Sequence, residues 1–120
     1  MEVGAKLQIR TGQRVAVLDA PAEVAVALPD GATRVTEAGE ADAVIAFVLD
    51  NAGLAGQATA ATLDAARADR LAWIAYPKAG QLGTDLNRDR LAATLAGRGV
   101  RPVRQVSIDP VWSALRFRPA

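Results

Sequence analysis

One short stretch decides the fold: in Ala43-Val44-Ile45-Ala46-Phe47-Val48-Leu49, every residue is apolar. A run of this length, rich in β-branched residues and with no polar face, predicts a strand covered on both faces, as in a parallel sheet. Asp50 or Asn51 then offers a cap for a helix that continues through an alanine-rich segment to about residue 68. Gly53 and Gly56 weaken the first turns of that helix. The stretch therefore predicts a buried strand followed by a helix.

Working outward from this stretch, short apolar runs bounded by turn residues predict further strands at 14–18, 33–36, 71–76, 103–108 and 113–117. Two further helices are predicted. One runs from Ala22 to Leu28, where Pro21 suits the first helical position, and the other runs from a cap at Thr84 to the glycines near residue 97. Strands separated by helices imply right-handed crossovers and a parallel sheet.

The last predicted strand differs from the others. Leu115 and Phe117 fall on one face and Arg116 and Arg118 on the other, which is typical of a half-exposed antiparallel strand. The sequence therefore predicts one α/β domain, a three-layer sandwich with a mostly parallel, Rossmann-like sheet and an antiparallel C-terminal strand. Numbered along the chain, the strands are expected in the order second, first, third, fourth, sixth, fifth, with the first strand central.

The amino-acid composition limits the reactions and binding sites that the chain can support. The chain has 120 residues, the usual size of one domain, and contains no cysteine and no histidine. Disulfides, thiolate metal sites, serine–histidine triads and most zinc sites are thereby excluded. Any catalysis would use carboxylates, hydroxyls, Lys78 or Tyr76. The net charge of +1 gives no reason to expect a nucleic-acid or membrane partner, and the first residues lack the apolar run of a signal peptide, so a cytoplasmic location is expected.

The lead-in from Leu7 to Asp19 resembles the opening of Rossmann-type methyltransferases that use S-adenosylmethionine. Those enzymes continue into a glycine-rich turn, because the backbone there must approach the cofactor. Here the turn is Asp19-Ala20-Pro21-Ala22-Glu23, without glycine, so no cofactor is expected and S-adenosylmethionine should not bind. Glu37 stands near the spacing of a ribose-binding acid; the alternative is a solvated glutamate at a strand end.

A second resemblance covers most of the chain and is carried by four segments: Lys6 to Val15, Tyr76-Pro77-Lys78, Thr84 to Asp89 and Ile108 to Phe117. Together they resemble a family of small uncharacterised bacterial proteins that is described only as a domain of unknown function. That family reads tryptophan-proline-lysine at the second segment. The resemblance implies a small methyltransferase-like fold and carries over no activity.

In a parallel sheet, ligands bind outside the carboxyl ends of the strands. The predicted ends and the loops after them gather five candidate ligand-binding residues: Tyr76, Lys78, Asp85, Asp109 and Trp112. Lysine can anchor a phosphate or carboxylate, and tryptophan can stack on a flat ligand. The alternatives are a solvated loop lysine, a helix cap made by Thr84 and Asp85, and a tryptophan that covers the core. The expected partner is a small anionic or flat ligand, held between loop 76–84 and turn 109–112.

Three functions stay open at this point. The leading hypothesis is a non-catalytic binding or regulatory module. The second is a small transferase-like enzyme that uses Lys78 and the strand-end carboxylates, and the third is an interaction domain that forms a homodimer through its C-terminal hairpin. No catalytic residue and no metal site is assigned.

Overall fold

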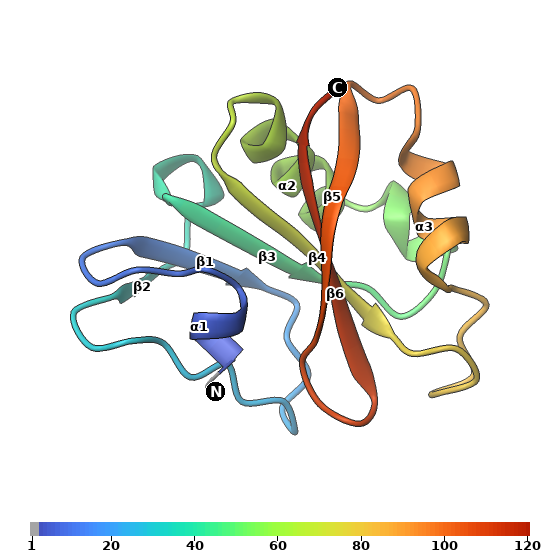
Figure 1. Cartoon of the computed structure of the whole chain (residues 1–120), viewed down its shortest axis with the longest axis horizontal. Helices are drawn as coiled ribbons and strands as arrows, with labels where there is room; N and C mark the ends of the chain where they lie inside the picture. Colours follow the sequence, from blue (N-terminus) through green and yellow to red (C-terminus); the bar gives the residue numbers. More distant parts are fainter. Residues whose placement is uncertain (1–2) are drawn as a thin grey trace.

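The computed structural model describes residues 3–120 and contains a six-stranded mixed sheet (Figure 1). The strands are β1 (Arg14–Leu18), β2 (Thr33–Val35), β3 (Ala43–Phe47), β4 (Leu71–Pro77), β5 (Val100–Ser107) and β6 (Trp112–Pro119). The helices are α1 (Val3–Lys6), α2 (Gln57–Arg67) and α3 (Arg88–Leu95), with short 3₁₀ helices η1 (Ala38–Glu40) and η2 (Ala52–Ala55). Of the apolar run 43–49, residues Ala43–Phe47 form β3 and all five are buried, whereas Leu49, beyond the end of the strand, is exposed.

The strand order is β2-β1-β3-β4-β6-β5, as predicted, and β6 is antiparallel to both of its neighbours. The predicted fold class is nevertheless wrong. The two longest strands, β5 and β6, pair antiparallel, and only β2, β1, β3 and β4 run parallel, so the sheet is mixed and its order is not that of a Rossmann fold. The prediction that β1 is central is also wrong, because β3 and β4 occupy the middle.

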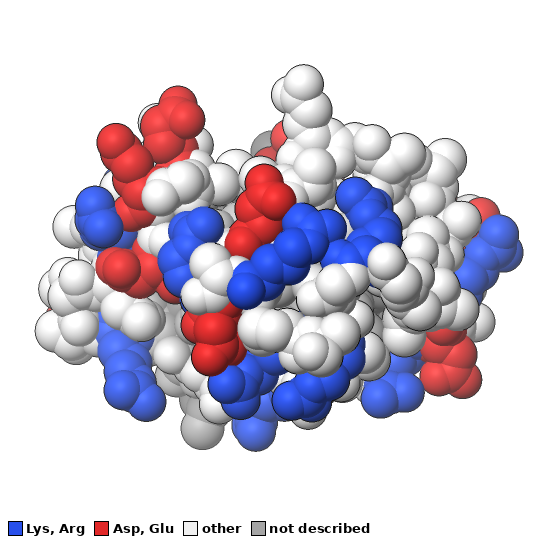
Figure 2. All heavy atoms as spheres, turned by 90° about the horizontal axis from the view of Figure 1, so that it is seen from above, with Lys and Arg blue, Asp and Glu red and all other residues white. Residues whose placement is uncertain are grey.

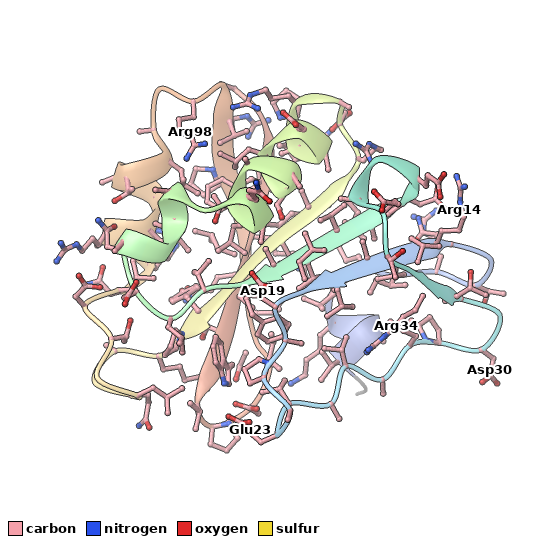
Figure 3. All side chains as sticks on the ribbon, turned by 180° about the vertical axis from the view of Figure 1, so that it is seen from behind. Arg14, Asp19, Glu23, Asp30, Arg34 and Arg98 are labelled. Atoms are coloured by element: carbon pink, nitrogen blue, oxygen red, sulfur yellow. The ribbon has the colours of Figure 1, made fainter. Side chains whose placement is uncertain are left out.

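The three-layer arrangement is corrected as well, because the two multi-turn helices lie on one face of the sheet. Leu63 of α2 and Leu91 of α3 pack in one cluster with Ile74 and Leu115 of the sheet. The opposite face is covered by the single turn of α1 and by the coil of residues 19–32. Figures 1 and 3 show the two faces from opposite sides.

The predicted helix at residues 22–28 is absent, and its burial pattern explains why. Val24, Val26 and Leu28 turn toward the second core cluster, while the residues between them are exposed, so the segment alternates with period two, as extended chain does. Contacts fix this coil to the rest of the molecule. The guanidinium of Arg34 donates to the carbonyl of Val26 at 3.0 Å, and the amide of Gly4 donates to the carbonyl of Ala27 at 3.0 Å.

The start of α3 also differs from prediction. Its cap is Asn87, whose side chain accepts from the amide of Arg90 at 2.8 Å, and Thr84 instead accepts from the amide of Leu86 inside the preceding loop. Asp85 therefore lies before the helix and not in its first turn. Among residues 3–120, no helix has the length and apolar character that a membrane span needs.

Candidate functional site

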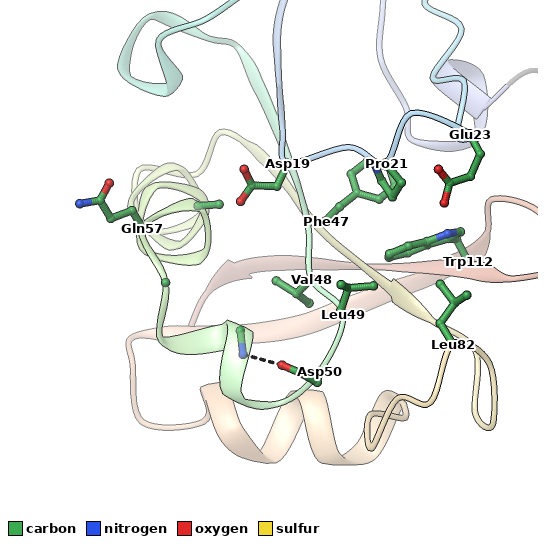
Figure 4. A pocket seen from close by; sticks show the side chains of 13 residues that line it. Asp19, Pro21, Glu23, Phe47, Val48, Leu49, Asp50, Gln57, Leu82 and Trp112 are labelled. Atoms are coloured by element: carbon green, nitrogen blue, oxygen red, sulfur yellow. Dashed lines mark hydrogen bonds between the residues drawn. The ribbon is translucent and has the colours of Figure 1, made fainter.

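A cavity of about 500 Å³ opens at the carboxyl ends of β1 and β3 (Figure 4). The chain leaves β1 toward β2 on one side and leaves β3 toward β4 on the other, so neighbouring parallel strands diverge here. Such divergence creates the crevice in which open α/β sheets bind ligands, and the volume lies in the range of small-molecule sites. Its lining comes from three regions: the strand ends and coil (Asp19, Pro21, Glu23, Phe47, Val48, Leu49, Asp50), the start of η2 and α2 (Gly53, Gly56, Gln57, Ala58), and two side chains from the other edge (Leu82, Trp112).

The apolar part of the lining is unusually open to solvent. Leu49 is 55% exposed and Leu82 is 56% exposed, and they are two of only three large hydrophobic side chains that are exposed within residues 3–120. Trp112 and Phe47 stand behind them, with ring centroids 5.2 Å apart and planes inclined at 69° in an edge-to-face pair. The cavity thus has an aromatic wall and two leucines whose side chains are more than half exposed.

The polar part of the lining is acidic. Asp19, Glu23 and Asp50 reach the cavity, and no lysine or arginine among the described residues 3–120 lines it. One oxygen of Asp50 accepts from the amide of Gly53 at 2.9 Å at the start of η2, whereas the α-helix that was predicted to begin at Asp50 or Asn51 begins only at Gln57. Figure 3 places Asp19 at the end of β1, and Figure 4 shows Glu23 on the side of Trp112 opposite Leu82.

Two lining residues have strained backbones. Asp19 has φ 59° and Leu82 has φ 53°, in the left-handed region that side chains other than glycine, asparagine and aspartate seldom adopt. For Asp19 this explains how β1 turns without the glycine that the sequence lacks. For Leu82 the conformation costs about 1–2 kcal/mol, and it is found at the cavity rim.

Two further hollows adjoin this cavity. One of about 530 Å³ is more open and extends from Asp19 to Glu37, so Glu37 does lie beside the end of β1. The other, of about 290 Å³, continues past Trp112 to Asp109 and Val111. Trp112 and Asp109 are therefore the only two of the five predicted site residues that line the cavity or its continuations, within residues 3–120.

The turn between β5 and β6 is built by Asp109. One of its carboxylate oxygens accepts from the amide of Val111 at 2.8 Å and from the amide of Trp112 at 2.7 Å. The amide of Lys78 donates to the carbonyl of Val111 at 2.7 Å, and its ammonium donates to the hydroxyl of Ser107 at 2.7 Å. Lys78 thus ties β4 to this turn, and it does not line the cavity.

Tyr76 and Asp85 lie elsewhere. Tyr76 is buried on the helix-covered face, where its hydroxyl accepts from the side-chain amide of Gln105 at 2.7 Å. Asp85 accepts from the amide of Asn51 at 2.9 Å and approaches Arg90 to 3.6 Å, so it joins the start of η2 to α3. The structure therefore brings Lys78, Asp109 and Trp112 together at one turn and separates them from Tyr76 and Asp85.

Burial raises the pKa of the Tyr76 hydroxyl, and the hydrogen bond from Gln105 opposes this only in part. A raised pKa in the folded state means that the neutral phenol is favoured by folding. The contribution is complete below about pH 10, the ordinary tyrosine pKa, and is lost as the pH rises through the folded-state value. We expect the free energy of unfolding to fall as the pH rises above about 10. In the Tyr76→Phe variant we expect the free energy of unfolding, measured by urea unfolding, to fall less over the same pH range. An equal pH dependence in the variant and the parent would refute the role given to the Tyr76 hydroxyl.

The C-terminal hairpin forms the edge of the sheet. β5 is the outermost strand, and its arginines Arg101 and Arg104 are exposed, as expected for an edge that resists pairing with another sheet. Arg101 donates to the carbonyl of Pro119 at 3.2 Å within the hairpin. The homodimer through this hairpin stays a prediction.

Comparison with known proteins adds no relative: no protein-family model matches the chain, and no curated protein sequence matches it. The resemblances to methyltransferases and to a family of small bacterial proteins therefore stay predictions. No group of three or more acidic side chains that could hold a metal ion is present within residues 3–120.

The cavity lies at the carboxyl edge of the parallel strands, where the sequence predicts a site, and the predicted loop 76–84 and turn 109–112 contribute Leu82 and Trp112 to its lining. The site prediction omitted the rest of the lining. It missed Leu49 and Leu82, because an apolar residue at the end of a strand or inside a loop is ordinarily assigned to the core. Leu82 carries one signal in hindsight: it lies between Gln81 and Gly83 in a loop of polar and small residues, where an apolar side chain has no core to enter.

Proposed function

We propose that this domain is a non-catalytic binding module whose ligand occupies the cavity at the carboxyl ends of β1 and β3. One observation carries the proposal: Leu49 and Leu82 are both exposed and both line this cavity. Each exposed leucine would be covered by a ligand, at a gain of about 25 cal/mol for every Å² of apolar surface removed from water. A cytoplasmic setting, expected from the sequence, is kept as part of the proposal.

The lining also suggests the chemistry of the ligand. The edge-to-face pair of Trp112 and Phe47 offers an aromatic wall for a flat apolar body. Asp19 and Glu23 lie at the same cavity without a basic neighbour in the lining, so they favour a ligand that carries a positive charge. The flat ligand expected from the sequence fits this site, whereas an anionic ligand would meet like charge here.

The enzymatic alternative rested on Lys78, and its placement gives that alternative less support. The Lys78 ammonium already donates to Ser107 and lies outside the lining. Of the groups named for the enzymatic alternative, only carboxylates line this cavity among the described residues, without the lysine that was expected beside them. A binding role needs only the apolar wall and the acidic rim.

Calorimetry with two small probes tests this proposal. Phenethylamine and 3-phenylpropionate have the same flat ring and opposite charges. We expect phenethylamine to bind saturably with a Kd of about 1 mM or below, and 3-phenylpropionate to bind at least about fivefold more weakly, a difference of about 1 kcal/mol. No saturable binding of the amine, or stronger binding of the acid, would contradict the proposal.

The strained residue Leu82 provides a sharper test. At an ordinary position, glycine is less stable than alanine by about 0.5–1 kcal/mol. At Leu82, where φ is 53°, we expect the glycine variant to be more stable than the alanine variant, because glycine adopts this conformation freely. We expect Leu82→Gly to be more stable than Leu82→Ala by about 1 kcal/mol in urea unfolding, while both bind phenethylamine more weakly than the parent. Val103→Ala, at an exposed residue outside the cavity, is the control and should leave binding unchanged.

A further inference from the structure

A second cavity, of about 380 Å³, lies at the opposite end of the parallel strands, near the starts of β3 and β4 and toward the end of β6. Its lining is mostly polar and includes three arginines, Arg10, Arg70 and Arg116, and two aspartates, Asp42 and Asp69. Figure 2 shows the molecule from above, with Lys and Arg side chains spread across that face and Asp and Glu side chains between them. Unlike the first cavity, this one is built around positive charge.

Both aspartates are already neutralised by arginines that do not line the cavity. Asp42 accepts from the amide of Arg14 at 2.8 Å and lies 3.7 Å from the guanidinium of the same residue. Asp69 accepts two hydrogen bonds from Arg118, at 3.0 and 3.1 Å, and this pairing holds the pKa of the Asp69 carboxyl below its ordinary value. The three lining arginines therefore lack a carboxylate partner within residues 3–120.

Arg116 is the least compensated of the three. Its side chain is half-buried on β6. One terminal nitrogen of its guanidinium donates to the side-chain oxygen of Gln8 at 2.8 Å. The Nε atom is buried and has no acceptor among the described residues. Burial lowers the pKa of this guanidinium, the charges of Arg118 and Arg104 lower it further, and the charge of Asp69 opposes this only in part. A buried donor without an acceptor and a cation beside other cations are both unfavourable unless an anion is near.

Arg70 is held in place for the same cavity. One of its terminal nitrogens donates to the carbonyl of Ala38 at 2.9 Å and to the carbonyl of Ala41 at 2.7 Å. Two neutral carbonyls fix the orientation of the guanidinium and leave its charge unbalanced. Arg10 also lines this cavity, and its side chain is exposed.

We propose that this second cavity binds a small oxyanion, the phosphate or carboxylate group of a ligand, between Arg10, Arg70 and Arg116. Guanidinium groups present planar pairs of donors that match the oxygens of phosphate and carboxylate. Gln8 and Gln13 supply neutral polar neighbours at the same site. This site is separate from the apolar cavity at the other end of the strands, so either proposal can fail alone.

Inorganic phosphate and acetate, titrated at constant ionic strength with sodium chloride as the balancing salt, test the site by amide chemical shifts in NMR. We expect a saturable response at residues 8–13, 69–71 and 116 to at least one of the two ions. Arg116→Gln and Arg10→Gln should each weaken that response by about tenfold, the factor that corresponds to about 1.4 kcal/mol. Arg10 has an exposed side chain, so its variant keeps the test valid if Arg116→Gln fails to fold.

Arg88→Gln is the matched control, because it removes one exposed positive charge from α3, outside this cavity. It should leave the affinity unchanged. The absence of a saturable response to both ions, or an equal loss in the control and in both lining variants, would overturn the proposal and leave only general screening of a basic surface.

Discussion

Replacing Trp112 with alanine is expected to lower the free energy of unfolding by about 3–5 kcal/mol and to abolish binding of phenethylamine. The side chain is 2% exposed and packs edge-to-face against Phe47, so its removal leaves a large void between β6 and β3. The same indole forms the wall of the apolar cavity, so the loss of stability and the loss of binding have one cause.

Trp112→Phe separates these two effects. A phenyl ring keeps most of the buried apolar surface and the contact with Phe47, so the loss of stability should be about half of that in Trp112→Ala, and amine binding should be weakened but measurable. Urea unfolding and calorimetry on the same samples give both quantities. A loss below about 1 kcal/mol in Trp112→Ala would show that the indole is not part of the core.

The second large effect is expected at Gly4, which holds the coil of residues 19–32 against α1. A Cβ atom at this position would lie 2.6 Å from the carbonyl oxygen of Ala27 and 2.9 Å from Cδ of Pro29. Since both neighbours belong to the main chain or to a rigid ring, the coil must shift. We expect Gly4→Ala to cost about 1–3 kcal/mol of stability, although alanine is the better helix former.

This coil also supplies Pro21 and Glu23 to the apolar cavity, so Gly4→Ala should weaken phenethylamine binding from a distance. Gly39→Ala is the matched control: a Cβ there meets no atom within 4 Å, and the residue lies outside the left-handed region. The control should be neutral or more stable by up to about 1 kcal/mol. Equal stabilities of the two variants in thermal unfolding would contradict the close approach of α1 to the coil.

The strands were predictable because their signals are local. The unbroken apolar run of β3 and the alternation of Leu115 and Phe117 with Arg116 and Arg118 specify burial directly. The segment at 22–28 was not predictable in the same way. Its alanines and Pro21 favour a helix, whereas the period-two spacing of Val24, Val26 and Leu28 fits an extended chain. Tertiary contacts from Gly4 and Arg34 select the extended chain. Because this segment forms no helix, the third layer of the predicted sandwich is absent from the described residues.

The candidate sites were predictable only in part, for a reason that lies in the topology. Residues at strand ends can be named from sequence, and Asp19, Asp50 and Trp112 do reach the apolar cavity. The basic cavity joins Arg10, Arg70 and Arg116, which lie far apart in the chain and meet only because β6 runs antiparallel beside β4. No local pattern signals such a meeting.

The measurement that tests the central claim most directly is a map of amide chemical shifts in NMR as phenethylamine is added. If the ligand occupies the apolar cavity, we expect the largest shifts at the ends of β1 and β3 and at the start of α2, at residues 19–23, 47–50 and 56–58, together with Leu82 and Trp112. We also expect residues 8–13 and 116, at the opposite end of the strands, to stay unchanged. Shifts spread over the surface, or largest at the arginine-lined end, would contradict the central claim.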